Sequence, residues 1–288
     1  MTLDRWINIL VPITLIEMMV ASGLGVTFSE VLAVARNWSL VARAAVANYV
    51  LVPAATIALL LVFRAEPMVA AGFLILAVCP GAPYGPPATA VAKGNVTIAV
   101  GLMIILAGSS AILAPPLLKL LLPMMAGGAP AQIGLAKMAM TLMVTQLIPL
   151  CVGLGIRHWY PNAAAKSRKP ANRLSLLLNL TVIVLILTAQ YQMLLAIRAR
   201  GLVGMLALLA VSFVVGWLLG RGDDRKAMTL STAIRNVGVG LVIATTAFPD
   251  TPVLTAILAY GLIQVVGTLL AASAWSQMGS RELAVSAR

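Results

Sequence analysis

The sequence predicts an all-α membrane protein with nine transmembrane helices. Hydrophobic residues make up 61% of the 288 residues, charged residues make up only 10%, and the mean hydropathy is +1.02. A soluble domain needs much more polar surface than this to face water. The first apolar run is long and has no convincing small-residue cleavage site after it, so we do not expect a cleavable signal peptide.

Each predicted span is an apolar run of about the 20 residues that a helix needs to cross a bilayer. Charged residues or clusters of proline and glycine separate the runs, which fall at 7–26, 39–63, 67–92, 94–122, 133–156, 174–197, 201–220, 226–248 and 252–277. The longest connection is expected to be a loop from Arg157 to Arg173, too short for a soluble domain. The chain is therefore predicted to be one transmembrane domain over 1–288.

Basic residues gather in the loops on one side of the predicted bundle. Thirteen lie on that side, at 36, 43, 93, 157, 166, 168, 169, 173, 221, 225, 226, 281 and 288. Six lie on the other side, at 5, 64, 119, 137, 198 and 200. Cytoplasmic loops are enriched in Lys and Arg, which predicts an N-out, C-in arrangement in a plasma membrane, such as a bacterial inner membrane. The net charge of +12 then reflects topology and contact with anionic headgroups, and no nucleic-acid partner is expected.

The two halves of the chain have a similar order of helices. In each half an interrupted helix, 67–92 or 226–248, precedes an uninterrupted one, 94–122 or 252–277. The first half contains four predicted spans and the second contains five, so the two halves enter the membrane in opposite directions. This pattern predicts an inverted repeat, with the substrate bound where the interrupted helices meet.

The first interruption is the run from Cys79 to Pro87, CPGAPYGPP. Its four prolines cannot continue a helix because they lack backbone N–H donors. Broken backbone at mid-membrane depth is tolerated only inside protein or beside a wet cavity. We expect Pro83, Tyr84 and Gly85 to line a binding site, and a structural kink without a ligand is the alternative.

The second interruption is the polar run from Ser231 to Gly238, STAIRNVG. A guanidinium at membrane depth normally faces a cavity, a carboxylate or an anionic substrate, so Arg235, Asn236 and Thr232 are candidate substrate-binding residues. The alternative is that the helix begins later and leaves Arg235 among the headgroups. Against this, the polar stretch from Asp223 already supplies a start on the water side.

Other polar residues inside apolar runs are candidates for ion coupling. Glu17 is the one acidic residue well inside such a run. It could pair with Arg235, titrate during transport, or simply bond to a neighbouring helix. Asn48 and Gln264 carry amides inside apolar runs and are further candidates for ion coupling, although such amides can also hold helices together without binding an ion. Ser231 completes the candidate ion-coupling set.

Two motifs carry a resemblance to a known family. The run Pro80–Asn95, PGAPYGPPATAVAKGN, resembles the fourth-helix signature of the bile acid:sodium symporter family, and Met228–Leu241, MTLSTAIRNVGVGL, resembles its ninth-helix signature. The resemblance implies a nine-helix form with a panel domain (1–35 and 133–200) and a core domain (36–132 and 201–288). It also implies two interrupted helices that cross in the core, and transport of small organic anions driven by sodium.

The chain departs from the family pattern at the sodium sites that the resemblance implies. Sodium-coupled members carry a Ser-Asn pair where this chain has Gly85 and Pro86. In the following helix they carry a Ser and a Thr where this chain has Ala99 and Met103. In the ninth family helix they carry a Glu and a Gln where this chain has Ser231 and Arg235. Asn48 corresponds to a family Gln and keeps the amide. Because hard cations need several oxygen ligands, the sodium sites are expected to be degenerate. Our hypothesis is that the Arg235 cation fills the space of a sodium ion.

The predicted function is secondary-active transport of a small organic anion by alternating access. The coupling ion, H⁺ or Na⁺, and the oligomeric state stay open. The alternative is a passive channel or facilitator, which should show rings of polar residues along several helices. No enzyme activity, cofactor or metal site is expected: His158 is the single histidine, placed in a loop, and Cys79 and Cys151 are expected to be small buried apolar residues.

Overall fold

The computed structural model describes residues 3–125, 134–195, 197–249 and 251–286, and every regular element within these ranges is a helix. Eight helices in this part of the chain are long and apolar enough to cross a membrane. They are α1 (Leu3–Leu24), α3 (Trp38–Val46) with η1 (Ala47–Leu51) and α4 (Val52–Phe63), α7 (Val96–Met125), α8 (Leu135–Leu142) with η2 (Met143–Leu147) and α9 (Ile148–Trp159), α10 (Pro161–Leu195), α11 (Ala199–Leu219), η3 (Gly222–Asp224) with α12 (Arg225–Ala233) and α13 (Val237–Ala247), and α14 (Pro252–Ser286).

The remaining predicted span, 67–92, is not a continuous helix. It consists of α5 (Pro67–Ala77) and α6 (Gly85–Val91), separated by the proline-rich run. Neither piece is long enough to cross a bilayer alone. Nine crossings therefore remain a prediction, because the ninth depends on this interrupted pair.

The structure corrects the predicted loop from Arg157 to Arg173. Helix α9 continues to Trp159, and α10 begins directly afterwards at Pro161. Proline is favoured at the first helical position, and the alanine-rich residues that follow favour a helix. His158 accordingly lies in the last turn of α9. Two predicted features, the start of the fifth span at 133 and the basic Arg288, lie outside the described residues.

A second unpredicted helix, α2 (Phe28–Ala35), joins α1 to α3. Its N-terminus is a capping box: the Glu30 N–H donates to Thr27 Oγ1, and the Thr27 N–H donates to the Glu30 carboxylate at 2.7 Å. This pairing satisfies two backbone donors that would otherwise be free.

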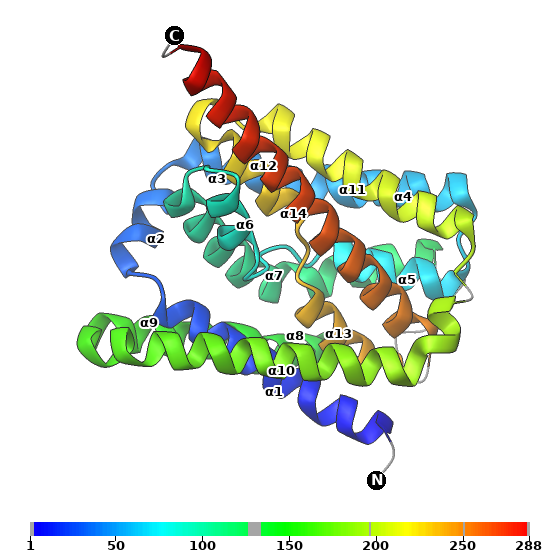
Figure 1. Cartoon of the computed structure of the whole chain (residues 1–288). Coiled ribbons are helices and arrows are strands. Elements are labelled where there is room, and N and C mark those ends of the chain that lie inside the picture. The colour runs from blue at the N-terminus through cyan, green and yellow to red at the C-terminus, as the bar shows by residue number, and fades with distance from the viewer. Residues whose placement is uncertain (1–2, 126–133, 196, 250, 287–288) are drawn as a thin grey trace.

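Helices α1, α9 and α10 lie together on one side of the molecule (Figure 1). Helix α1 packs against both α9 and α10. Two glycines allow the close approach of α1 to α9, since an added Cβ at Gly23 would lie 2.5 Å from the Leu150 oxygen, and one at Gly153 would lie 2.3 Å from the Val20 oxygen. Cys151 on α9 is exposed, contrary to the prediction of a buried apolar residue.

Two short π-helical segments have the same sequence context. Segments η1 and η2 are each followed by a helix with proline in its first turn, Pro53 in α4 and Pro149 in α9. Proline lacks the donor that would continue the regular ladder, and a π-turn is one way to absorb the disruption. Each segment carries a fully buried amide, Asn48 in η1 and Gln146 in η2.

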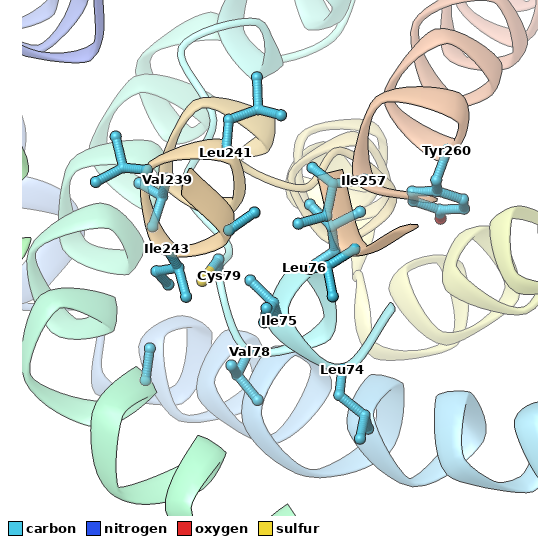
Figure 2. Packing of buried hydrophobic residues seen from close by; sticks show 14 of the residues in the cluster. Leu74, Ile75, Leu76, Val78, Cys79, Val239, Leu241, Ile243, Ile257 and Tyr260 are labelled. Atoms are coloured by element: carbon cyan, nitrogen blue, oxygen red, sulfur yellow. The ribbon is translucent and has the colours of Figure 1, made fainter. Parts of the chain in front are cut away.

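The largest hydrophobic cluster of the described residues reaches the start of the first interruption, at Val78 and Cys79. Figure 2 shows the end of α5 and the residues beyond it, through Cys79, packed between α13 and α14. The labelled contacts include Leu76 of α5, Val239 of α13 and Ile257 of α14, all buried. This apolar packing holds the broken backbone inside protein, as membrane depth requires.

Candidate functional site

The two interrupted helices are joined through their backbones. The backbone N–H of Asn236 donates to the Cys79 oxygen at 2.8 Å. The Asn236 side chain also donates to the Gly81 oxygen at 3.3 Å and accepts from the Val239 N–H at 3.2 Å, which caps α13. One asparagine therefore satisfies donors and acceptors from both breaks, which would be costly to leave unpaired here. We call this meeting point the crossing, defined by residues 78–84 and 234–236.

Gly81 holds the first break against α7. Its φ is +83°, a backbone conformation that residues with a Cβ rarely adopt. An added Cβ would also lie 2.2 Å from the Ala107 nitrogen. The backbone of the crossing can approach α7 this closely only because the residue is glycine.

Arg235 lies at the centre of the crossing and is 2% exposed. Its Nη2 donates to Asn48 Oδ1 at 2.8 Å and to the Thr232 carbonyl, and its Nη1 donates to the Ala77 carbonyl at 3.3 Å. Gln264 of α14 fixes the backbone of Arg235 with a pair of bonds, accepting from N–H at 2.9 Å and donating to C=O at 2.8 Å. The guanidinium thus has a single defined position.

No carboxylate forms an ion pair with this guanidinium among the described residues. The ion pair that the described residues do form joins Arg43 to Asp224 at 2.8 Å, in the last turn of α3 and just before α12. All three acceptors of Arg235 are neutral oxygens, and its Nε has no partner. Because a guanidinium does not lose its proton in proteins, the crossing carries a permanent buried positive charge that no carboxylate of the described residues neutralises.

The acceptors around Arg235 resemble the surroundings of a bound cation. Carbonyl and amide oxygens from Ala77, Thr232 and Asn48 converge on the guanidinium. Oxygen dipoles of this kind replace the water shell of monovalent cations in membrane proteins. The arrangement can stabilise a positive charge, which arginine itself supplies.

Two buried hydroxyls beside Arg235, those of Ser231 and Thr232, have no hydrogen-bond partner within the described part of the chain. An added Cβ at Gly85 would lie 3.9 Å from Ser231 Oγ, so α6 begins next to this hydroxyl. Tyr84 is 38% exposed and Pro83 is half-buried, so both lie at the edge of the crossing. The predicted substrate and ion residues of the two breaks therefore lie in one region.

Glu17 lies apart from this cluster. Its carboxylate accepts a hydrogen bond from Ser175, which joins α1 to α10. In the described part of the chain it forms no ion pair with Arg235. Of the alternatives for Glu17, a bond to a neighbouring helix is the one that the structure contains, and its titration during transport stays a prediction.

Comparison with known proteins gives a match to the family model described as "Sodium Bile acid symporter family" over residues 12–216. The chain belongs to the sodium bile acid symporter family. This is a family of membrane transporters and not of enzymes, and the eight candidate spans in the described residues agree with an integral membrane protein. The family match ends before α12, so Arg235 lies beyond the matched residues.

A relative in this family is the probable sodium/metabolite cotransporter BASS2, chloroplastic, of Oryza sativa subsp. japonica. It is 28% identical over 144 residues, which cover 50% of this chain and 33% of that protein. The alignment thus spans about a third of the relative's length.

Four positions at which this chain departs from the family pattern offer no side-chain oxygen. Gly85 and Pro86 are buried at the start of α6, and Ala99 and Met103 are buried on α7. Hard cations need oxygen ligands, and these positions supply none from their side chains.

Sequence reasoning missed Gln146, a buried amide near the crossing. It is fully buried in η2 and donates to Ser110 Oγ of α7 at 2.9 Å and to the Ala107 carbonyl. The available signal was an amide inside an apolar run, the same signal that singled out Asn48 and Gln264.

Proposed function

We propose that the protein is a secondary-active transporter that moves a small organic anion by alternating access, with Arg235 as a fixed positive charge at the crossing. The observation that carries the proposal is the buried guanidinium, which has three neutral acceptors and no carboxylate partner in the described residues. A buried charge without a counter-charge is costly. An anionic substrate would supply that counter-charge during each transport cycle.

The same geometry argues against sodium coupling through the family's usual positions. The Arg235 guanidinium occupies the oxygens of Asn48, Ala77 and Thr232. A sodium ion there would face a permanent like charge as well as a reduced set of ligands. The relative is named a sodium/metabolite cotransporter, so sodium dependence is the property to measure. A proton acting through Glu17 is the alternative coupling ion.

The moving parts would be the panel (1–35 and 133–200) and the core (36–132 and 201–288). Polar side-chain contacts connect the two groups of helices: Thr255 of α14 donates to Gln190 of α10 at 2.9 Å, and Gln146 of η2 donates to α7. A polar-edged cavity of about 30 Å³ lies between them, lined in part by Asn8 and Thr245. Within the described residues these polar contacts are few, which supports motion of one body against the other because few such bonds would need to break.

The placement of basic residues supports an N-out, C-in orientation in a bacterial inner membrane. The unpartnered polar atoms gathered at the crossing favour a closed central site over the open pore of a channel, which would need polar rings along several helices.

Uptake into proteoliposomes tests the proposal. Purified wild-type protein is reconstituted, and a panel of radiolabelled carboxylates, sulfonates and neutral analogues is offered, with and without unlabelled solute inside. We expect saturable, trans-stimulated uptake of anions and none of the neutral analogues. Arg235→Gln should lose this uptake while Arg200→Gln, which changes an exposed arginine on α11, should retain it. Non-saturable flux of neutral solutes would instead indicate a passive channel.

A further inference from the structure

A second set of unpartnered polar atoms lies beside the crossing but outside it. Gln146 Oε1 on η2 and Thr14 Oγ1 on α1 are both buried, and neither has a hydrogen-bond partner among the residues that the structure describes. Gln146 is 0% exposed and Thr14 is 5% exposed. Buried polar atoms in proteins are nearly always paired, so each exception calls for an explanation.

The orientation of the Gln146 amide follows from its neighbours on α7. The Ala107 carbonyl can only accept a hydrogen bond, so it must face the amide nitrogen of Gln146 and not its oxygen. Ser110 Oγ lies 2.9 Å from the same nitrogen and itself donates to the Ala107 carbonyl at 2.9 Å. The nitrogen of Gln146 is thereby held on α7, and Oε1 is left as a free acceptor.

Thr14 differs from most hydroxyls in the spans. Those hydroxyls bond back to a carbonyl one turn earlier in their own helix, which satisfies them without a partner elsewhere. This is the case for Ser22, Thr56, Thr141, Thr145, Thr181, Thr188, Ser212, Thr245, Thr246 and Thr268. The Thr14 hydroxyl makes no such bond.

The elements that carry these two atoms meet next to the crossing. Helix α1 packs against both η2 and α13. Leu15 lies against Gly238, where an added Cβ would be 3.2 Å away, and Gly238 is two residues after Asn236. Ala107, which accepts from Gln146, is also the residue against which Gly81 packs. Gln146 and Thr14 therefore lie on the panel side of the boundary that the crossing forms with α1 and η2.

We propose that Gln146 is a specificity-determining residue whose Oε1 accepts a hydrogen bond from a hydroxyl or N–H group of the transported anion, with Thr14 Oγ1 as a second partner. This inference rests on the proposed function, because it concerns the same anion. The two side chains are neutral, so they select for a hydrogen-bond donor and not for a second charge. The transported anion is then a hydroxylated or amide-bearing carboxylate and not a plain alkyl carboxylate.

Matched pairs of carboxylates that differ by one hydroxyl test this proposal. The probes are glycolate and acetate, lactate and propionate, and 3-hydroxybutyrate and butyrate. Affinity is measured for the purified full chain by ligand-induced thermal stabilisation, and uptake is measured in proteoliposomes. We expect wild type to prefer the hydroxylated member of at least one pair by about tenfold, the effect of one buried hydrogen bond.

Variants separate this role from a structural one. Gln146→Met keeps the side-chain length and should bring the preference to about one without abolishing uptake of the plain carboxylate. Thr14→Val should reduce the preference, while Thr145→Val should not, because the Thr145 hydroxyl is satisfied by Thr141 of its own helix. If Gln146→Met does not fold, Thr14→Val and its control decide the question.

The outcomes are distinguishable from failure of the proposed function. Equal affinity of wild type for both members of every pair, or a preference that survives in Gln146→Met, would overturn the specificity role while anion transport stands. Absence of binding and uptake for every probe would overturn both.

Discussion

Replacing Asn48 by aspartate would neutralise the buried cation at the crossing with almost no change in shape. Asn48 is fully buried, and its Oδ1 lies 2.8 Å from Arg235 Nη2. Its Nδ2 donates to the Ala44 carbonyl at 2.9 Å, so the substitution replaces that bond with an unfavourable contact between two acceptor oxygens. In return the guanidinium gains a carboxylate at hydrogen-bond distance. We therefore expect Asn48→Asp to fold, with a melting temperature at or above that of wild type.

The effect on anion binding follows from the charge. Two opposite unit charges about 4 Å apart attract by roughly 4 kcal/mol at the effective dielectric constant of about 20 that suits protein sites. An anion bound at a comparable distance from Arg235 would lose most of that attraction in Asn48→Asp. Since about 1.4 kcal/mol corresponds to tenfold in affinity, binding should weaken by about two to three orders of magnitude.

Titration calorimetry with a transported anion measures the affinity, and differential scanning fluorimetry measures the stability. Asn48→Leu is the matched control, because it removes the acceptor without adding charge. It should destabilise the protein by about 1.5–3 kcal/mol, the value of a hydrogen bond to a charged group, and retain anion binding. A folded Asn48→Asp protein that binds the anion as tightly as wild type would refute the role of the Arg235 charge.

Three further changes give separate tests. Gly81→Ala should prevent accumulation of folded protein, because the added Cβ would lie 2.2 Å from the Ala107 nitrogen at a φ of +83°. The control Gly134→Ala should be tolerated, because nothing lies within 4 Å of an added Cβ there. Equal yields of the two variants would contradict the close packing of Gly81 on α7. Glu17→Gln should abolish the pH dependence of net uptake but keep exchange, and an unchanged pH profile would end the proposal of proton coupling through Glu17. Hydrogen bonds from Thr27 hold the pKa of Glu30 below its usual 4.5, so Glu30 stabilises the fold above that pH and less as the pH falls through its lowered pKa. Melting curves of Glu30→Gln should therefore lie below those of wild type at neutral pH and converge with them in acid, and a gap that persists in acid would contradict this.

Eight of the nine predicted spans coincide with helices long and apolar enough to cross a membrane, because hydropathy reports residence in lipid over the length of a helix. It does not report helicity in water, and so the extension of α10 from Pro161 was predicted as a loop. The alanine-rich composition of that stretch was the missed signal. The Thr27 and Glu30 capping box that begins α2 was equally visible as a spacing of three residues. For the π-helical segments η1 and η2, the sequence signals were Pro53 and Pro149 in the first turn of the helix that follows each segment.

The crossing was partly predictable because polar groups at membrane depth must find one another. Arg235, Asn48 and Gln264 were singled out as isolated polar residues, and the structure joins them by hydrogen bonds. Their exact pairing depends on how η1, the break after α12 and α14 pack, which no local pattern encodes. The position of Glu17 shows the same limit, since its bond to Ser175 joins residues 158 positions apart.

The most direct test of the central claim is the rate of anion uptake by wild-type proteoliposomes in sodium medium and in medium where N-methylglucamine replaces sodium. If Arg235 supplies the positive charge at the crossing, the two rates should be equal. Arg235→Gln frees the oxygens of Asn48, Ala77 and Thr232, so any uptake that survives in this variant should depend on sodium. A strict sodium requirement in the wild type would contradict the claim and would mean that the sodium bile acid symporter mechanism operates here through other ligands.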